Sequence, residues 1–482
     1  MKAAKIRVER IDDVRVRVPI QGAMRVEGRI YADEALMAHL TGDASVAQVA
    51  NVACLPGIVG AALAMPDIHS GYGFPIGGVA AFDPDNGGVV SPGGVGYDIN
   101  CGVRLHALDL DAEEVNVSRD RLGNDLLRAV PAGVGVGRSD SRLPQLDLIL
   151  QEGVGALVNA GIVSKADLET IEDGGCIRGA DPAAVSAKAR DRGFPQIGSL
   201  GSGNHFLEVD RVAAIYDAEL AEAFGLSFGK AVLLIHSGSR GLGHQVCEDV
   251  LPVMVRAARN AGIELPDKQL ACAPLGSEEA NRYLRGMAAA ANFAFANRAM
   301  LAERALTAIA AWLGVAREKL EAPLIYDVCH NIAKMEEHMI GGRSMRVCVH
   351  RKGATRAFGP NNPALPERYR LTGQPVIVPG DMGRYSYVLA GAKGAMEETF
   401  GSSCHGAGRL MSRGEAKRKM TGKEVVRVLA QRGIAVKAAS VDAAAEEMPD
   451  AYKDVADVVS VVDRAGIAKK VARLEPMLVV KG

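Results

Sequence analysis

The sequence lacks the features of membrane, secreted and disulfide-stabilised proteins. Among its 482 residues, no apolar window reaches the length of a membrane span without a charge. The charged start, MKAAKIRVERIDDVRVRV, has no signal-peptide apolar core. The eight cysteines form no CxxC pair and show no short disulfide spacing. We therefore expect a cytoplasmic protein with reduced thiols and no membrane partner.

An excess of positive charge is also missing. Lys and Arg number 56 against 57 Asp and Glu, which gives a formal net charge of −1. A protein that coats itself with nucleic acid is usually more basic, so the composition argues against broad nonspecific binding. A local basic groove stays compatible with it. Six cations lie near the motifs described below: Arg240, Arg351, Lys352, Arg356, Arg409 and Arg413.

The chain shows no fixed-period repeat and no linker rich in Gly, Ser or Pro. Apolar runs predict strands at 204–212 and 231–235, and helical periodicity is longest at 278–313. A further helix is predicted at 422–433, and 117–195 reads as mostly helical with breaks at Gly153 and at Gly174 and Gly175. Because the chemical motifs come from both ends of the chain, we expect one α+β domain spanning 1–482. Its sheets should be mixed or antiparallel and flanked by helices.

Glycine stands beside metal-ligand residue types in five segments. The chain has 55 glycines among 482 residues, which is a larger share than the average glycine content of roughly 7%. Glycine allows close backbone approach to a ligand, and Cys, His and Asp together suit Zn²⁺ or Mn²⁺. The pattern predicts one metal site assembled from distant segments, and hence a metal-dependent enzyme. The segments are GYDINCG (96–102), GSLGSGNHFLEV (198–209), LLIHSGSRGLGH (233–244), DVCHNIAK (327–334) and SSCHGAGR (402–409).

Five residues are candidate metal ligands. Asp98 and Cys101 stand three apart in a glycine-bounded loop, where a thiolate bridging two metals beside a carboxylate is chemically sensible. A turn Asp and a buried structural Cys are the common alternative. His205, His236 and His330 each stand at a strand–loop junction flanked by Gly, Ser or Asn. A lone His there is more often a hydrogen-bonded structural residue, but three of them favour metal binding.

His405 differs from the other histidines because it lies in a loop of small residues, four positions before Arg409. This arrangement suits a nucleophile facing a phosphate, with the arginine neutralising charge. A further metal ligand or a structural histidine fits the residue types equally well. Backbone N–H groups at 238–243 and 402–408 suit a phosphate nest. The spacing in GSRGLG does not fit GxGxxG, and no GxxxxGK[ST] loop occurs.

Three further features have weaker contexts. The segment HRKGATRAFGP (350–360) carries three cations among small residues, which indicates either a solvated face or an anion-facing loop. Lys481 follows an apolar LVV run, which predicts a docked rather than frayed tail. His69 and His350 are candidates for lining the same cleft.

Eight ordered blocks resemble the RtcB family of RNA-splicing ligases: DINCGVR, GSLGSGNHFLEV, HSGSRGLG, DVCHNIAK, HRKGATRAF, PGDMG, SCHGAGR and the final KG. The resemblance runs from about residue 60 to the last residue. It implies an RtcB-like fold and an enzyme that joins a 2′,3′-cyclic phosphate or 3′-phosphate RNA end to a 5′-hydroxyl end. It also implies GTP and two Mn²⁺ ions as cofactors, and tRNA halves or broken RNA as substrates. The role is tRNA splicing or RNA repair, with an archease-like protein as a candidate activator.

The resemblance implies two metals that share one thiolate. Asp98, Cys101 and His205 match the ligands of one metal. Cys101, His236 and His330 match those of the second.

The resemblance also assigns the nucleotide site. His405 matches the guanylated histidine, whose Nε2 would attack the α-phosphate of GTP before GMP passes to the RNA 3′-phosphate. Arg240, Arg409 and Arg413 are candidates for RNA phosphate contacts. The matches to guanine-nucleotide contacts are Asn204, His205, Phe206, Leu207, Glu208, His330, Asn331, Pro379, Gly380, Asp381, Met382, Ser386, His405, Gly406, Ala407, Gly408 and Lys481.

One position departs from the family pattern, since Asp381 stands where a serine is more typical. Its carboxylate would accept from a guanine N–H or a ribose hydroxyl, or it would repel phosphate. An alternative function is a two-metal phosphohydrolase or cyclic phosphodiesterase without covalent guanylation, because two-metal sites serve hydrolysis equally well. A non-catalytic RNA- or nucleotide-binding relative is the third reading, which the complete ligand set disfavours.

Overall fold

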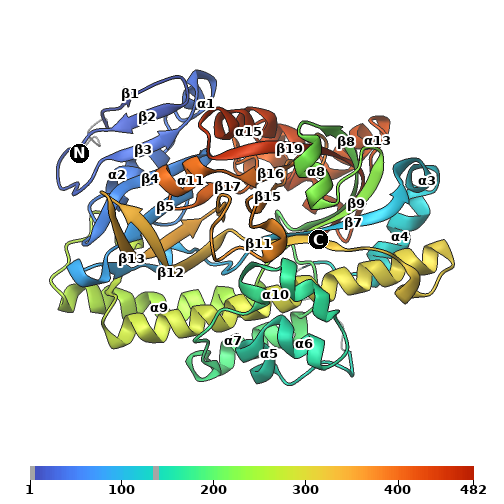
Figure 1. Ribbon diagram of the computed structural model, residues 1–482, viewed down its shortest axis with the longest axis horizontal. Helices are drawn as coiled ribbons and strands as arrows, with labels where there is room; N and C mark the ends of the chain where they lie inside the picture. Colours follow the sequence, from blue (N-terminus) through green and yellow to red (C-terminus); the bar gives the residue numbers. More distant parts are fainter. Residues whose placement is uncertain (1–5, 134–139) are drawn as a thin grey trace.

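Two large sheets organise the computed structural model, which describes residues 6–133 and 140–482 (Figure 1). The first sheet is antiparallel except for the parallel pair β3–β4. Its seven strands lie in the order β1 (Glu9–Arg10), β2 (Arg15–Val18), β3 (Gly28–Tyr31), β4 (Ile58–His69), β5 (Ile76–Phe82), β13 (Arg343–Lys352) and β12 (Asn331–Ile340).

The second sheet has eight strands and carries most of the predicted ligands. It is antiparallel apart from the parallel pair β18–β19. Its strands are β11 (Leu324–Cys329), β7 (Gly102–Asp111), β9 (Lys230–Ser237), β8 (Phe206–Ile215), β19 (Ala468–Lys481), β16 (Ser386–Gly391) and β15 (Pro375–Val378), with β18 (Ala435–Ala438) beside β19.

The central strand β9 is apolar on both faces, as expected of a strand covered on both sides. Val232 and Leu234 belong to one hydrophobic cluster, whereas Leu233 and Ile235 belong to another on the opposite face. Short two-stranded pairings complete the sheets: β6 (Val89–Val90) with β10 (Ala273–Pro274), and β14 (Ala354–Arg356) with β17 (Ser402–Cys404).

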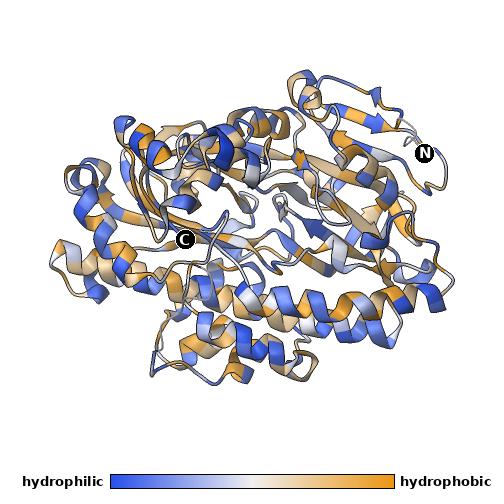
Figure 2. Ribbon diagram, turned by 180° about the vertical axis from the view of Figure 1, so that it is seen from behind, coloured by the Kyte–Doolittle hydropathy of each residue, from blue (hydrophilic) through white to orange (hydrophobic). Residues whose placement is uncertain are grey.

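Two long helices, α9 (Arg240–Asn260) and α10 (Glu278–Leu313), run along one side of the sheets (Figure 1). α10 begins where the Ser277 side chain accepts from Ala280 N–H and ends at Gly314 in a left-handed conformation. In Figure 2 polar and apolar segments alternate along these helices, as in amphipathic helices with one face on the core. Alanines dominate the buried part of α10, and Asn100 of the 96–102 loop donates its side-chain amide to the Ala291 carbonyl at 2.7 Å.

Shorter helices surround this framework. They are α1 (Glu34–His39), α2 (Ser45–Val52), α3 (Ala112–Val117), α4 (Arg119–Ala129), α5 (Leu146–Glu152), α6 (Val154–Asn159), α7 (Ala187–Gly193), α8 (Ala218–Phe224), α11 (Lys393–Glu398), α12 (Arg413–Lys419), α13 (Gly422–Gln431), α14 (Val441–Glu446) and α15 (Val455–Arg464). In the part of the chain that the structure describes, no helix has the length and apolar character needed to cross a membrane.

The predicted α+β architecture is confirmed. The strands expected at 204–212 and 231–235 correspond to β8 and β9, and the helices expected at 278–313 and 422–433 to α10 and α13. The mostly helical reading of 117–195 holds only in part, because turns and short 3₁₀ segments occupy 160–186. Asp173 and Gly174 take left-handed conformations there, which an α-helix excludes.

Candidate metal and nucleotide site

The fold brings the five predicted metal ligands to the edge of the eight-stranded sheet that is formed by the ends of its strands. Antiparallel neighbours place the end of one strand beside the start of the next. Asp98 and Cys101 precede β7, His205 precedes β8, His236 lies near the end of β9, and His330 follows β11. These four strands are adjacent in the order β11-β7-β9-β8, so segments far apart in the sequence meet at this edge.

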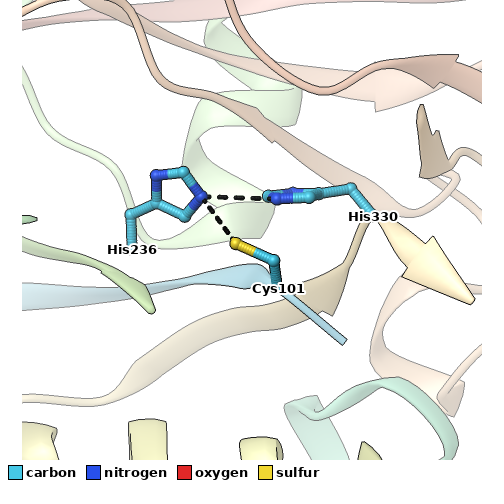
Figure 3. A group of neighbouring side chains, drawn as sticks. All are labelled: Cys101, His236 and His330. Atoms are coloured by element: carbon cyan, nitrogen blue, oxygen red, sulfur yellow. Dashed lines mark hydrogen bonds between the residues drawn. The ribbon is translucent and has the colours of Figure 1, made fainter. Parts of the chain in front are cut away.

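Their ligand atoms converge. The Nε2 atom of His236 lies 3.3 Å from the Sγ of Cys101 and 3.3 Å from the Nε2 of His330 (Figure 3). The Nε2 of His205 lies 3.4 Å from the same Sγ and 2.9 Å from Asp98 Oδ2. Tetrahedral ligands at about 2.1 Å from a metal are about 3.4 Å apart. The five residues thus form two groups of three that share Cys101, each with the spacing of a metal shell.

The electrostatics of these groups also suit a bound cation. Burial lowers the pKa of His236 and His330 well below the usual value, so both imidazoles are neutral and able to ligate. Burial, together with Asp98, raises the pKa of the Cys101 thiol well above its usual range. A divalent ion reverses that shift by stabilising the thiolate. The donor set therefore fits a pair of divalent metal ions.

Residues around the ligands hold Asp98 in place. Its Oδ1 accepts from the backbone N–H of Ser239 at 3.0 Å and from the Ser239 hydroxyl at 3.2 Å. Its backbone carbonyl accepts from the Asn331 amide at 3.0 Å. Burial would raise the pKa of Asp98, but His205 and Arg240 outweigh it and hold the pKa below the ordinary value. Asp98 is therefore an anion in the absence of any metal.

A pocket of about 250 Å³ adjoins this cluster, and His236 is on its wall. Three of its lining residues, Ile76, Glu447 and Tyr452, were not expected from the sequence. His69, Arg409 and Arg413, the weaker candidates, also line it. The predicted nucleotide contacts on its wall are Asn204, Phe206, Pro379, Gly380, Asp381, Met382, His405, Gly406, Ala407, Gly408 and Lys481.

Other predicted nucleotide contacts lie behind that wall. The Ser386 hydroxyl accepts from Gly380 N–H at 3.1 Å and so fixes the loop rather than lining the pocket. The Asn331 side chain is used by Asp98 and by Gly353 N–H. Leu207 packs into the hydrophobic cluster on the opposite face of β8. Glu208 is buried, and burial and Asp210 raise its pKa well above the usual range.

His405 is held by a partner that the sequence does not reveal. Its Nδ1 lies 2.5 Å from Oδ2 of the buried Asp67, which also accepts from the backbone N–H groups of His405 and Gly406. Burial would raise the pKa of Asp67, yet His405 and Lys453 keep it lowered. The Lys453 ammonium donates to the carbonyls of Pro66 and Ile68 on either side. With Nδ1 occupied, Nε2 is the nitrogen left for chemistry.

His405 also lies beside the metal-ligand cluster, since its ring centroid is 4.8 Å from that of His330. Asp67 was missed because it sits in MPDIHSG on β4, 338 residues before His405. The only local signal was an aspartate in an otherwise apolar run, two residues before His69.

The cations of 350–360 are buried, so the reading of this segment as a solvated face is wrong, and the anions that the arginines face are carboxylates of the protein itself. Arg351 is buried and donates to both carboxylate oxygens of Glu336, at 2.6 and 2.8 Å. The Lys352 ammonium donates to backbone carbonyls, including that of Gly93 at 3.2 Å. Arg356 donates to Asp173 at 2.9 Å. Each of the three side chains is at most 5% exposed, and none of them lines the pocket beside the metal-ligand cluster.

The three arginines proposed for RNA phosphates differ in how far their side chains are already paired or buried. Arg409 is largely used, because it bonds Glu447 and the Tyr452 hydroxyl. Arg413 is 53% exposed at the pocket wall. Arg240 lies 3.2 Å from Nδ1 of His205. His350 is buried and accepts from Ser91 N–H, and it does not line the pocket.

Comparison with known proteins places this site in a family. Residues 48–482 match the family model described as tRNA-splicing ligase RtcB. The chain belongs to the RtcB family. A protein of Thermococcus kodakarensis named tRNA-splicing ligase RtcB is 52% identical over 477 residues, covering 98% of this chain and 99% of the relative. Relatives with the same name from Archaeoglobus fulgidus and Methanococcus maripaludis are 52% and 48% identical, with 98% and 99% of this chain covered and 99% and 100% of theirs.

Proposed function

We propose that this protein is a GTP-dependent RNA ligase that joins 2′,3′-cyclic phosphate or 3′-phosphate RNA ends to 5′-hydroxyl ends, in tRNA splicing or RNA repair. The observation that carries the proposal is His405, held at Nδ1 by Asp67 in a pocket that adjoins the metal-ligand cluster. Membership of the RtcB family, whose relatives are named tRNA-splicing ligases, supports it.

In the first step, the lone pair on His405 Nε2 attacks the α-phosphorus of GTP. The new N–P bond forms as the P–O bond to pyrophosphate breaks. Asp67 accepts the Nδ1 proton in a hydrogen bond and stabilises the positive ring that develops. Two Mn²⁺ ions held by Asp98, Cys101, His205, His236 and His330 would supply charge neutralisation at the phosphates.

A 2′,3′-cyclic phosphate end is first opened by water to a 3′-phosphate. The second step is at the same α-phosphorus, and the third is at the phosphorus of the RNA 3′-phosphate. An oxygen of the RNA 3′-phosphate attacks the guanylate, the N–P bond breaks and His405 returns to its starting state. The 5′-hydroxyl then attacks the activated RNA phosphate, loses its proton and expels GMP. The exposed Arg413 lies at the pocket wall, where it would meet an RNA phosphate.

The wall of the pocket suits guanine. The Lys481 ammonium lies 5.5 Å from the centroid of the Phe206 ring. Burial lowers the pKa of Lys481, although Glu447 and Glu208 act in the opposite direction. Lys481, as a donor, and the Glu447 carboxylate, as an acceptor, both lie on the pocket wall. They complement the O6 acceptor and the N–H donors of guanine, and adenine presents the opposite pattern. Asp381 lies 3.3 Å from Arg384, which offsets its negative charge near phosphates.

The proposal is tested by incubating the protein with Mn²⁺ and GTP labelled at the α-phosphate, with labelled ATP in parallel. We expect acid-labile, alkali-stable label on the protein from GTP and not from ATP. His405→Ala should reduce labelling by at least about 10³-fold, because the nucleophile is gone. The exposed His39→Ala is the matched control and should label normally.

Full ligation by His405→Ala with its metals bound would sink the mechanism. Cleavage of a cyclic phosphate without any protein label or joining would favour the phosphodiesterase alternative. If labelling stops after one turnover, adding an archease-like protein tests whether an activator restores it.

A further inference from the structure

Three rings gather beside the metal ligands, in a chain with only 4% aromatic residues. Tyr97, the residue before Asp98, stacks on His244 with ring centroids 4.9 Å apart and planes at 29°. Tyr72 meets Tyr97 edge-on, at 5.4 Å and 64°. The Lys352 ammonium donates to the Tyr72 carbonyl and lies 6.0 Å from its ring, which fixes Tyr72 behind Tyr97.

These rings are not part of the hydrophobic core. Tyr72 and Tyr97 are partly exposed, and neither belongs to the hydrophobic clusters or the apolar residues packed against them. The His244 side chain is 44% exposed. Most other large aromatics, such as Tyr283 and Phe295, are buried. The three rings are therefore partly open to solvent, at a place where the hydrophobic clusters do not include them.

The first turn of α9 connects the rings to the metal-ligand cluster. Ser239, the residue before the helix, donates to Asp98, and Arg240 contacts His205. His244 lies four residues after Arg240, at the start of the same helix. Arg240 takes a left-handed conformation with φ of 54°, and its Nε is buried without a hydrogen-bond partner among the described residues. Arg240 therefore contacts the metal-ligand cluster, while His244 of the same helix carries the ring that stacks on Tyr97.

We propose that Tyr97 and His244, braced by Tyr72, form a stacking platform for a nucleobase of single-stranded RNA next to the reacting end. The inference rests on the proposed function, because RNA ends must then reach the metals. Stacking on aromatic rings binds any base and needs no excess of positive charge. It supplies affinity that this chain's net charge of −1 and its buried 350–356 cations do not supply.

The test is a double-mutant cycle that combines removal of a base from the RNA with removal of a ring from the protein. The measured quantity is the equilibrium binding of RNA, not the joining of its ends. Fluorescence anisotropy measures the Kd of short RNAs with Mn²⁺, ending in a 5′-hydroxyl or in a 3′-phosphate. Each RNA is compared with versions abasic at the first or second position. For the wild type, we expect one abasic position to weaken binding by about 5- to 100-fold. In His244→Ala and Tyr97→Leu that abasic penalty should fall to about twofold or less.

Control variants separate ring stacking from structural damage. Tyr97→Phe keeps the ring and should keep the wild-type abasic penalty. Tyr216→Ala removes a half-exposed ring that stacks on Tyr387 just beyond the far end of β8, and should also keep it. The proposal of a stacking platform would be wrong if the abasic penalty were the same in His244→Ala as in the wild type, at every tested position of both RNAs. The absence of RNA binding by the wild type would also contradict it. Labelling by GTP without RNA reports the proposed function separately, so either idea can fail alone.

Discussion

Buried carboxylates behave in opposite ways in two regions of this molecule. Around the pocket that adjoins the metal-ligand cluster, burial raises the pKa of Asp381, on the pocket wall, to about 6 and that of Asp210, on β8, to about 8. Both oxygens of Asp210 lack a hydrogen-bond partner among the described residues, as does Oδ2 of Asp381. Asp210 has no ion-pair partner among the described residues, and Arg384, 3.3 Å from Asp381, only partly offsets the burial of Asp381.

The other region is an ionic network behind the sheet edge, and its carboxylates are fully paired. Burial would raise the pKa of Glu172 and Asp173, but Lys334 and Arg356 outweigh it and lower both. We define the ionic network as Arg104, Asp167, Glu172, Asp173, Arg298, Asp327, Lys334 and Arg356.

The contrast distinguishes residues that pair within the fold from residues of the candidate site, although both kinds occur in one sequence motif. The block DVCHNIAK provides His330 to the metal-ligand cluster and Lys334 to the ionic network. Asp327 of the same block pairs with Arg298 at 2.8 Å. Paired charges stabilise the fold, whereas incompletely paired buried groups indicate a place for a ligand.

The largest expected effect comes from breaking the ionic network. Arg298→Met leaves Asp327 with only Arg104 at 3.2 Å and removes the donors to the carbonyls of Asn100 and Ser237. Removing one partner of a buried pair costs about 3–5 kcal/mol. We expect a loss of that size in the free energy of unfolding, measured by denaturant titration.

Arg128→Met is the matched control, since Arg128 is exposed and pairs with Asp125 on one helix face. It should change the free energy of unfolding by less than about 0.5 kcal/mol. Equal losses in Arg298→Met and Arg128→Met would break the comparison.

The second effect concerns the paired carboxylate that serves the site. Asp67→Asn keeps the size of the side chain but removes the anion that holds His405. We expect the rate of protein labelling by GTP to fall by about 10²-fold, or ~2.7 kcal/mol, while GTP binding is retained. Binding of a fluorescent GTP analogue and labelling kinetics measure the two quantities. Unchanged labelling would show that Asp67 has only a structural role.

The smallest effect is on pH dependence and tests the raised pKa of Asp381. Because the folded state holds this proton up to about pH 6 while the unfolded chain releases it near about pH 4, stability falls as pH rises through that window. Asp381→Asn should flatten this decline and stabilise the fold at pH 7 by on the order of 1–3 kcal/mol. Unfolding between pH 4 and 7 measures it, with the exposed Asp450→Asn as control. A decline that persists in Asp381→Asn would assign it to other groups, such as Asp210.

Part of the fold and site follows from the sequence alone. Local periodicity determined β8, β9 and α10, because apolar spacing within one segment decides strand or helix. Ordered Cys, His and Asp motifs also predicted the ligands that the sheet edge brings together. These features are local, so a linear chain displays them.

Only the tertiary structure decided which charges are satisfied. Lys352 looked available to an anion, yet it is enclosed by backbone carbonyls from residues 259 and 278 positions away. Asp67 looked unremarkable, yet it orients His405 across 338 residues. Tyr72, Tyr97 and His244 meet only because α9 starts beside Asp98. A hydrogen bond or ring contact depends on distance in space, and partners this far apart leave no local pattern in the sequence.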